Sequence, residues 1–120
     1  MLSIDIDGDD LHIWNGIREY RPKIVLIEYN PTIPTDTFFE NPPGRNVGNA
    51  PLSILSSFRE RDYTLAEGTD NNLIFVRADL ARRHGNEEKP LLQIVQQLSE
   101  RPPRYFFGYD GSLMIVDTTR

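Results

Sequence analysis

LSIDIDGDDL, residues 2 to 11, is the stretch that decides the fold of this chain. Its apolar residues alternate with polar ones as in a β-strand, and the run ends in a cluster of carboxylates around a glycine. In an open α/β sheet, ligands bind where the strands reach their carboxyl ends. The stretch therefore predicts a strand over residues 2–7, a tight turn at Gly8 and a site built from aspartates.

The next two segments complete a predicted βαβ unit. Residues 9–20 place Leu11 and Trp14 on one face of a helix. Residues 23–30, KIVLIEYN, form a nearly continuous apolar run, which is typical of a strand buried on both faces of a parallel sheet. Two strands joined in this way usually lie side by side. We therefore expect residues 2–7 to form an interior strand beside residues 23–30.

The segments that follow predict a mixed sheet. Residues 31–49 hold four prolines and show no periodic pattern, which is typical of a lid or binding loop. A helix that covers the sheet is predicted over residues 50–63, capped by Asn49. The runs at 63–68 and 72–77 are close enough for an antiparallel hairpin. The predicted class is α/β with a mixed sheet and a terminal antiparallel hairpin.

The C-terminal part of the chain has a looser pattern. A helix is predicted to begin at Pro90, and two apolar runs around Asp110-Gly111 are a strong hairpin signal. We therefore divide the chain into an α/β domain over residues 1–84 and a helix-plus-hairpin extension of unassigned role over residues 85–120.

Composition excludes several classes of protein. The 120 residues carry a formal net charge of -5, so the surface lacks the basic character that nucleic-acid binding requires. The chain has no cysteine, which excludes disulfides and thiolate metal sites. No apolar run reaches the roughly 20 residues that span a bilayer. We expect a cytoplasmic protein whose partners are neither nucleic acids nor membranes.

Polar side chains follow both of the strands that are expected to be neighbours. Asp5 and Asp7 end the first strand, and Glu28 and Asn30 end the second. Because neighbouring strands lie about 4.8 Å apart, their side-chain oxygens can converge on one point. An all-oxygen environment suits Mg²⁺, which would lower the pKa of an acceptor hydroxyl. Asp5, Asp7 and Asn30 are thus candidate metal ligands, with Tyr29 separating Glu28 from Asn30.

Simpler structural roles are open for some of these carboxylates. Asp7 and Asp9 can cap the following helix, which is worth about 1 kcal/mol, and Asp10 is favourable in a first helical turn. Asp5 differs, because on a strand buried on both faces an unpartnered carboxylate costs several kcal/mol. We therefore expect a functional or hydrogen-bonding role for Asp5.

The loop over residues 31–49 contributes two aromatic candidates. Phe38 and Phe39 are adjacent, so both rings cannot point inward, and one is expected to line an acceptor pocket. His12 lies on the polar side of the first predicted helix, where a solvated position is favoured over a role as catalytic base.

Three motifs together resemble the C-terminal half of the FkbM-like S-adenosylmethionine-dependent methyltransferases. They are LSIDIDGDDLHIWNGI, KIVLIEYNP and GTDNNLIFVRADL, and they extend over about residues 2–80. The resemblance implies a doubly wound, Rossmann-like sheet of seven strands whose last strand runs antiparallel. Residues 2–7 would then be the fourth strand, 24–29 the fifth, and 63–77 the sixth and seventh.

The resemblance also implies an activity and the residues that carry it. Members of the family transfer a methyl group from S-adenosylmethionine, here to the oxygen of a small-molecule or glycan hydroxyl. On that basis Asp5, Asp7 and Glu28 would be catalytic, with Asp7 standing where the family commonly has glutamate. The residues expected to bind the acceptor are Tyr29, Asn30, Phe38 and Phe39.

The cofactor-binding part of the family fold has no counterpart in these 120 residues. No GxGxG occurs, and the first two strands of the family fold would precede Met1. We therefore expect a partial or truncated methyltransferase, assign no cofactor-binding residue, and expect the isolated chain to bind the methyl donor poorly.

Two other classes of function stay open. Asp5, Asp7 and Gly8 are similar to the first motif of haloacid dehalogenase-type phosphatases, in which Asp5 would be the nucleophile and Asp7 the acid. That family has threonine after the glycine, where this chain has Asp9. The other class is a non-catalytic remnant that folds with a partner chain supplying the missing N-terminal half.

Overall fold

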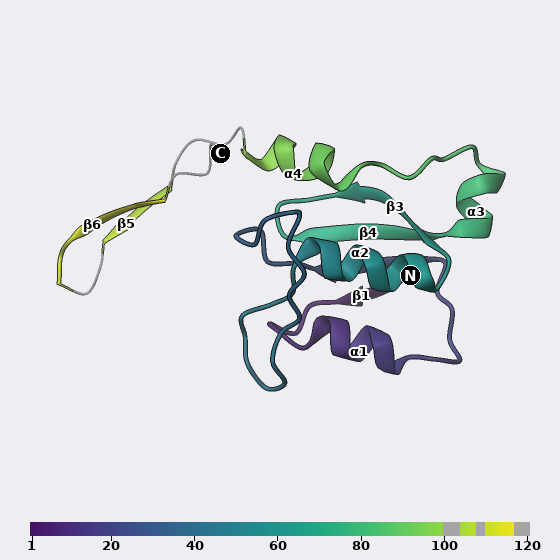
Figure 1. Ribbon diagram of the computed structural model, residues 1–120, viewed down its shortest axis with the longest axis horizontal. Helices are drawn as coiled ribbons and strands as arrows, with labels where there is room; N and C mark the ends of the chain where they lie inside the picture. Colours follow the sequence, from purple (N-terminus) through teal and green to yellow (C-terminus); the bar gives the residue numbers. More distant parts are fainter. Residues whose placement is uncertain (100–103, 108–109, 117–120) are drawn as a thin grey trace.

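A four-stranded mixed sheet organises the fold (Figure 1). The computed structural model describes residues 1–99, 104–107 and 110–116. The strands lie in the order β1 (Leu2–Ile4), β2 (Ile24–Glu28), β4 (Asn72–Arg77) and β3 (Tyr63–Gly68). β1 and β2 are parallel, whereas β4 is antiparallel to both β2 and β3. The predicted α/β class with a mixed sheet is confirmed, as is the parallel pairing of the first two strands.

Two helices cover one face of this sheet. α1 (Asp10–Gly16) and α2 (Pro51–Glu60) meet through Trp14 and Phe58, whose rings stack with their centroids 4.2 Å apart. Phe58 also stacks on Phe75 of β4 at 4.0 Å, and all three rings are fully buried. Because aromatic rings bury a large apolar area in a defined geometry, this stack fixes both helices against the sheet.

The apolar run of the second strand is buried on one face only. Val25 and Ile27 lie beneath the helices, while Ile24 is 38% exposed and Leu26 is half-buried. Alternate residues of a strand point to opposite faces. The prediction of a strand buried on both faces is therefore wrong, because α1 and α2 pack on the same face.

The first strand lies at an edge of the sheet. β1 ends at Ile4, and β2 is its one neighbour in the described sheet. Within the described sheet, the prediction of an interior strand over residues 2–7 is therefore wrong. The strand ends early because Asp7 and Gly8 have positive φ values of 56° and 140°, which turn the chain out of the sheet.

α1 ends at Gly16, before the predicted end at Tyr20. The Arg61 side chain binds the carboxyl end of this helix. Its guanidinium donates to the carbonyl oxygens of Trp14, at 2.7 Å, and of Ile17. The same guanidinium lies 4.0 Å from the centre of the Trp14 ring. Since the last carbonyls of a helix have no partners within it, this arginine caps α1 from the end of α2.

Two further helices follow the sheet. α3 (Ala78–Arg83) begins directly after β4, and α4 (Leu91–Ser99) adds Leu91 and Ile94 to the core. The helix predicted to begin at Pro90 is confirmed. None of the described helices combines the length and the apolar character that crossing a membrane requires.

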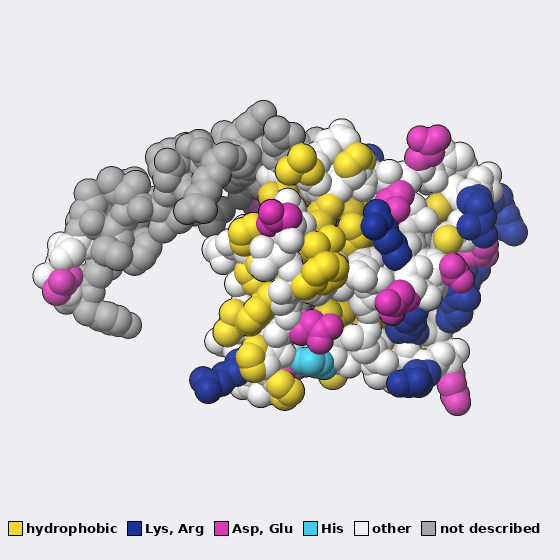
Figure 2. Space-filling view, in the orientation of Figure 1, with side chains coloured by type: hydrophobic (Ala, Val, Ile, Leu, Met, Phe, Trp, Pro, Cys, Tyr) yellow, Lys and Arg dark blue, Asp and Glu magenta, His cyan; other side chains and the backbone are white. Residues whose placement is uncertain are grey.

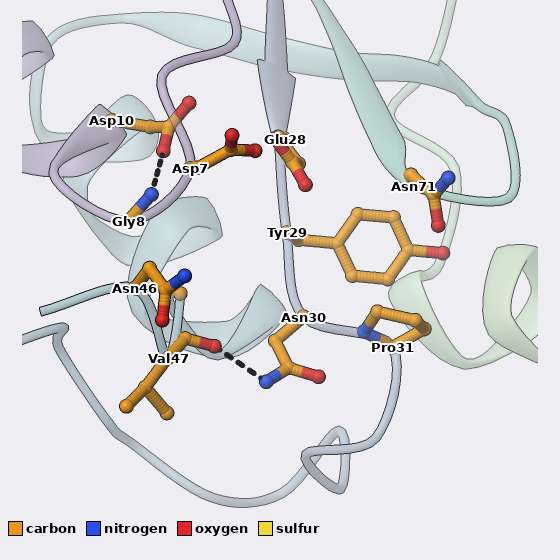
Figure 3. Close-up of a pocket in the computed structure, with 11 residues that line it drawn as sticks. Asp7, Gly8, Asp10, Glu28, Tyr29, Asn30, Pro31, Asn46, Val47 and Asn71 are labelled. Carbon is orange, nitrogen blue, oxygen red and sulfur yellow. Dashed lines mark hydrogen bonds between the residues drawn. The ribbon is translucent and has the colours of Figure 1, made fainter.

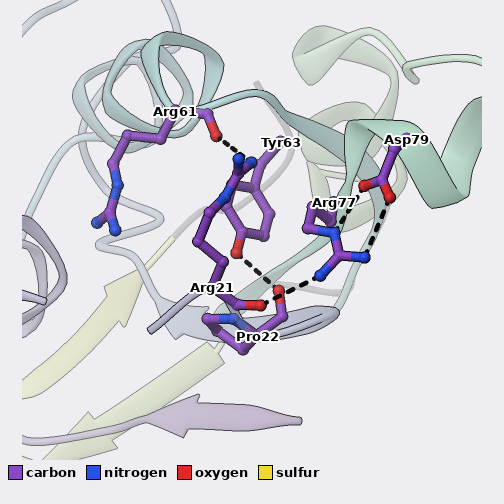
Figure 4. Close-up of polar contacts among 6 residues, drawn as sticks. All are labelled: Arg21, Pro22, Arg61, Tyr63, Arg77 and Asp79. Atoms are coloured by element: carbon purple, nitrogen blue, oxygen red, sulfur yellow. Dashed lines mark hydrogen bonds and ion pairs between the residues drawn. The ribbon is translucent and has the colours of Figure 1, made fainter. Parts of the chain in front are cut away.

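Polar contacts at the amino end of β2 tie the chain that follows α1 to β3 and β4 (Figure 4). The Tyr63 hydroxyl donates to the Pro22 carbonyl oxygen at 2.6 Å, and Arg77 donates to the Arg21 carbonyl oxygen at 3.4 Å. Arg77 also pairs with Asp79, and this ion pair lowers the pKa of Asp79 to about 2. Figure 2 shows Lys and Arg side chains gathered on the side of the molecule that carries α3.

A separate hairpin completes the described chain. β5 (Arg104–Phe107) and β6 (Leu113–Val116) pair antiparallel and form a second sheet. In the turn, Gly111 has a φ of 85°, and the Ser112 amide donates to Asp110 Oδ1 at 2.9 Å. The hairpin predicted around Asp110-Gly111 is confirmed.

Candidate functional site

A pocket of about 230 Å³ lies at the carboxyl ends of the two parallel strands (Figure 3). Its lining residues are Asp7, Gly8, Asp10, Glu28, Tyr29, Asn30, Pro31, Asn46, Val47, Gly48 and Asn71. Figure 3 shows the carboxylates on one side of the pocket and Asn30 with Val47 on another. The pocket is thus formed where the opening turn, the end of β2 and the loop 31–49 meet, at the sheet edge where α/β folds bind ligands.

The Asp10 carboxylate holds the opening turn in place. It is 2% exposed, and its oxygens accept the backbone amides of Ile6 at 3.1 Å and Gly8 at 3.0 Å. Gly8 packs tightly against the loop, because a β-carbon there would overlap the Arg45 carbonyl oxygen. Asp10 therefore does more than place a charge in the first turn of α1: it satisfies two amides of the pocket wall.

Glu28 and Asp5 form a pair of carboxyl groups at the ends of the two parallel strands. One carboxylate oxygen from each of Asp5, Asp10 and Glu28 lies within 4.8 Å of the others. If both members of the pair were ionised, neither could donate, and the buried Glu28 Oε2 would have no partner among the described residues. A proton shared between Glu28 and Asp5 gives this buried oxygen a hydrogen-bond partner. This hydrogen bond raises the pKa of Glu28 to about 7, assisted by burial and by the charges of Asp5, Asp10 and Asp7.

Asn41, which sequence reasoning missed, anchors the loop 31–49. It is 1% exposed, and its Nδ2 donates to Asp9 Oδ1 at 3.0 Å. Its Oδ1 accepts the backbone amides of Val47 and Gly48, both at 3.0 Å. A single buried amide therefore links the opening turn to the part of the loop that lines the pocket.

Asn49 has a different role from the predicted one. α2 begins after Ala50, without a side-chain cap, so the prediction that Asn49 caps this helix is wrong. Asn49 is instead buried, donates to the Gly8 carbonyl oxygen at 3.0 Å and accepts the Asn41 amide at 2.8 Å. It joins the loop to the opening turn a second time.

Replacing Asn41 by alanine is expected to destabilise the chain by about 1–3 kcal/mol, because it leaves the Val47 and Gly48 amides without their acceptor. Urea unfolding measures this change, and hydrogen exchange at Val47 and Gly48 should become faster. Asn46→Ala, at an exposed position of the same loop, is the matched control and should change stability by less than about 0.5 kcal/mol. Equal stability of the two variants would contradict the anchoring role.

The predicted catalytic residues lie together, although their burial differs from expectation. Asp7 and Glu28 line the same pocket, and Asp5 contacts Glu28. Asp5 is exposed, so the expectation of a buried carboxylate at this position is wrong, because β1 is a short edge strand. The carboxylate buried among these residues is that of Asp10.

Tyr29 and Asn30 line the pocket as predicted for acceptor-binding residues, but their polar groups are engaged within the protein. Asn30 Nδ2 donates to the Val47 carbonyl oxygen at 2.7 Å, and its Oδ1 accepts the Thr32 amide at 2.9 Å. The Tyr29 hydroxyl donates to the Thr69 carbonyl oxygen at 3.2 Å. Both residues therefore shape the pocket wall.

Phe38 and Phe39 lie outside this pocket, contrary to the prediction that one of them lines it. Phe38 is 67% exposed, and the Phe39 amide donates to Ser53 Oγ of α2 at 2.8 Å. The anchoring of the loop by Asn41 keeps residues 46–48, and not the aromatic pair, at the pocket.

The predicted helix caps make other contacts. α1 has no side-chain cap, so the capping roles of Asp7 and Asp9 are wrong. Asp9 instead contacts Asn41. His12, expected to be solvated, is partly buried, with its Nε2 at 2.6 Å from the Asn41 carbonyl oxygen.

The carboxylates that converge differ from the predicted metal ligands. Asp5, Asp7 and Asn30 were the expected set, whereas Asp5, Asp10 and Glu28 are the residues whose oxygens converge. Asn30 is excluded by its bonds within the loop, and Asp7 belongs to the pocket wall but not to this cluster. A Mg²⁺ ion at this edge of the sheet stays a prediction.

Comparison of this chain with protein-family models, curated proteins and solved structures finds no match.

Proposed function

We propose that this chain forms the acceptor-binding part of an S-adenosylmethionine-dependent methyltransferase that acts on the oxygen of a small-molecule or glycan hydroxyl. The observation that carries the proposal is the position of Glu28. It lines the pocket at the carboxyl ends of the parallel strands, and its pKa is raised to about 7. A general base is most effective when its pKa lies near the working pH.

The chemistry assigned to this chain is proton transfer and positioning. In the proposed reaction the Glu28 carboxylate accepts the proton of the acceptor hydroxyl, and Asp5 shares that proton through the hydrogen bond between the two carboxyl groups. Asp7 and the walls formed by Tyr29 and Asn30 orient the acceptor in the pocket. Correct orientation matters because the hydroxyl oxygen must face the methyl group that it attacks.

We propose that another polypeptide segment binds the methyl donor. The donor would supply an electrophilic methyl group, but these 120 residues contain no glycine-rich GxGxG turn of the kind that holds it in the resembling family. These residues do not fit a site for the donor, so we assign none of them to it. The outer edge of β1 has no neighbour in the described sheet and is where a strand of the missing half would pair.

The strand arrangement supports the same proposal. In the resembling family the last strand of the sheet runs antiparallel. Here β4 is the last strand of the four-stranded sheet along the chain and is antiparallel to both of its neighbours. We therefore also propose that this chain forms the second half of a Rossmann-like methyltransferase sheet.

The test is reconstitution of the two halves. The proposal expects the gene region upstream of the Met1 codon, or a neighbouring gene, to encode an apolar strand followed by a glycine-rich turn. Co-expressed with this chain, that segment should give methyl transfer from S-adenosylmethionine to polyol hydroxyls, whereas this chain alone should show no donor binding by calorimetry. Donor binding without methyl transfer in the reconstituted protein contradicts the proposal. Hydrolysis of a phosphate ester that is lost in Asp5→Asn would favour the phosphatase alternative.

A further inference from the structure

A second hollow lies at the other end of the sheet from the pocket that Glu28 lines, where β2 begins and β4 ends. Its volume is about 370 Å³, and its lining residues are Arg21, Asp62, Arg77, Asp79 and Arg82. The three arginines come from three separate segments, which are the chain after α1, the last residue of β4, and α3. The fold thus gathers positive charge on one hollow of a chain whose formal net charge is -5.

Two of these arginines are held in place by contacts within the protein (Figure 4). Arg21 Nη2 donates to the Arg61 carbonyl oxygen at 3.0 Å, and the Arg21 guanidinium lies 5.8 Å from the centre of the Tyr63 ring. Arg77 donates to the two carboxylate oxygens of Asp79, at 2.6 and 3.0 Å, and to the Arg21 carbonyl oxygen at 3.4 Å. Side chains that are ordered before a ligand arrives lose less entropy when it binds.

The carboxylates of the hollow balance its positive charge only in part. Asp79 is engaged with Arg77, which leaves Asp62 as the other carboxylate of the described lining. The Arg82 side chain is exposed and makes no hydrogen bond or ion pair with another described residue. A guanidinium has five N–H donors, of which Arg21 uses one within the protein. Arg21 and Arg82 therefore present donors that lack acceptors.

Neighbouring cations add to the positive potential at this end of the sheet. Burial lowers the pKa of the Arg61 guanidinium, and the charges of Arg21 and Arg18 lower it further, while Tyr63 acts in the opposite direction. Like charges that lie close together repel one another. An anion bound beside Arg21 would relieve this repulsion.

A phosphate monoester matches the hollow better than other anions. Its phosphate group carries a charge of about -1.5 to -2 at pH 7 and has three acceptor oxygens, whereas a carboxylate has one charge and two oxygens. Arginine binds phosphate through paired hydrogen bonds. A volume of about 370 Å³ leaves room beside the phosphate for the organic part of a small molecule. The net charge of -5 opposes binding of a long polyanion such as a nucleic acid.

We propose that this hollow binds the phosphate group of a small phosphate monoester between the guanidinium groups of Arg21 and Arg82. Arg77 holds the Arg21 backbone and adds a third guanidinium to the lining. The inference goes beyond the proposed function and does not depend on it, because the hollow lies at the other end of β2 from Glu28.

The experiment compares glucose 6-phosphate with glucose and with inorganic phosphate. Each is titrated into the full chain, and binding is followed by the NMR shifts of the Asp62, Arg77 and Arg82 amides. Glucose 6-phosphate should bind at least about tenfold more tightly than glucose, because only the phosphate meets the free guanidinium donors. Inorganic phosphate should move the same signals with a lower affinity, because it lacks the organic part that fills the rest of the hollow.

Two neighbouring variants of α3 locate the binding site. Arg82→Gln should weaken glucose 6-phosphate binding by about tenfold, the effect of losing a charge-assisted hydrogen bond. Arg83→Gln makes the same charge change at the next residue, which is exposed but does not line the hollow, and should weaken binding by less than about twofold. Both positions are exposed, so both variants should stay folded.

Three results would overturn the inference. They are no binding of glucose 6-phosphate, an affinity equal to that of glucose or of inorganic phosphate, and equal losses in the two variants. A preference for glucose 6-phosphate that Arg82→Gln removes and Arg83→Gln keeps would support it.

Discussion

Glutamine in place of Glu28 is expected to slow methyl transfer by the reconstituted protein by about 10²- to 10⁴-fold, the range that loss of a general base produces. Glutamine keeps the size of the side chain and can donate to Asp5, so the pocket should keep its shape. It cannot accept the proton of the acceptor hydroxyl. Measurement of kcat and KM should therefore show the loss in kcat, with KM for the acceptor changed much less.

The pH profile separates this role from a structural one. In the native protein kcat should rise as the pH rises through about 7, because Glu28 acts in its ionised form. Glu28→Gln should lose that rise, while Glu40→Gln should keep both the rate and the profile. A Glu28→Gln enzyme with a native rate and a native pH profile would contradict the assignment of the base.

Removal of the Phe58 ring is expected to destabilise the fold by about 3–5 kcal/mol, the usual cost of Phe→Ala in a core. Phe58 is fully buried and stacks on Trp14 on one side and on Phe75 on the other. Its loss would open a cavity where α1, α2 and β4 meet. Because small domains are stable by only about 5–15 kcal/mol, Phe58→Ala should unfold at a much lower urea concentration.

Phe38→Ala supplies the matched control for the core variant. The same ring is removed from a position that is 67% exposed, so the change in stability should stay below about 0.5 kcal/mol. Similar unfolding midpoints for Phe58→Ala and Phe38→Ala would show that the aromatic stack does not hold the helices on the sheet.

The elements of the fold were predictable where apolar residues form a short run or repeat at helical spacing. The apolar run in residues 72–77 and the spacing of Leu11 and Trp14 gave the correct strand and helix, and the parallel pairing of β1 with β2 followed from their order along the chain. Periodicity reports which residues are apolar. It does not show whether helices cover one face of the sheet or both. Leu26 was therefore expected to be buried and is only half-buried.

The site was predictable only in part, because its supports depend on contacts distant in the sequence. Carboxylates at consecutive strand ends brought Asp5 and Glu28 together, as their spacing along two parallel strands requires. Asn41 contacts Asp9 across 32 positions, from a loop with no period at all. From the composition of that loop, Phe38 or Phe39 was predicted to line the pocket instead. Buried asparagines in proline-rich loops are therefore worth examining as anchors, since their amides satisfy the backbone groups that the loop itself cannot.

Titration of the Glu28 side-chain carboxyl carbon by NMR shows whether this group has the raised pKa that a general base at neutral pH requires. We expect a midpoint near pH 7 in the full chain and a lower midpoint in Asp5→Asn, because that substitution removes both the shared proton and the charge of Asp5. A midpoint near the ordinary glutamate value of 4.5, unchanged by Asp5→Asn, would contradict it.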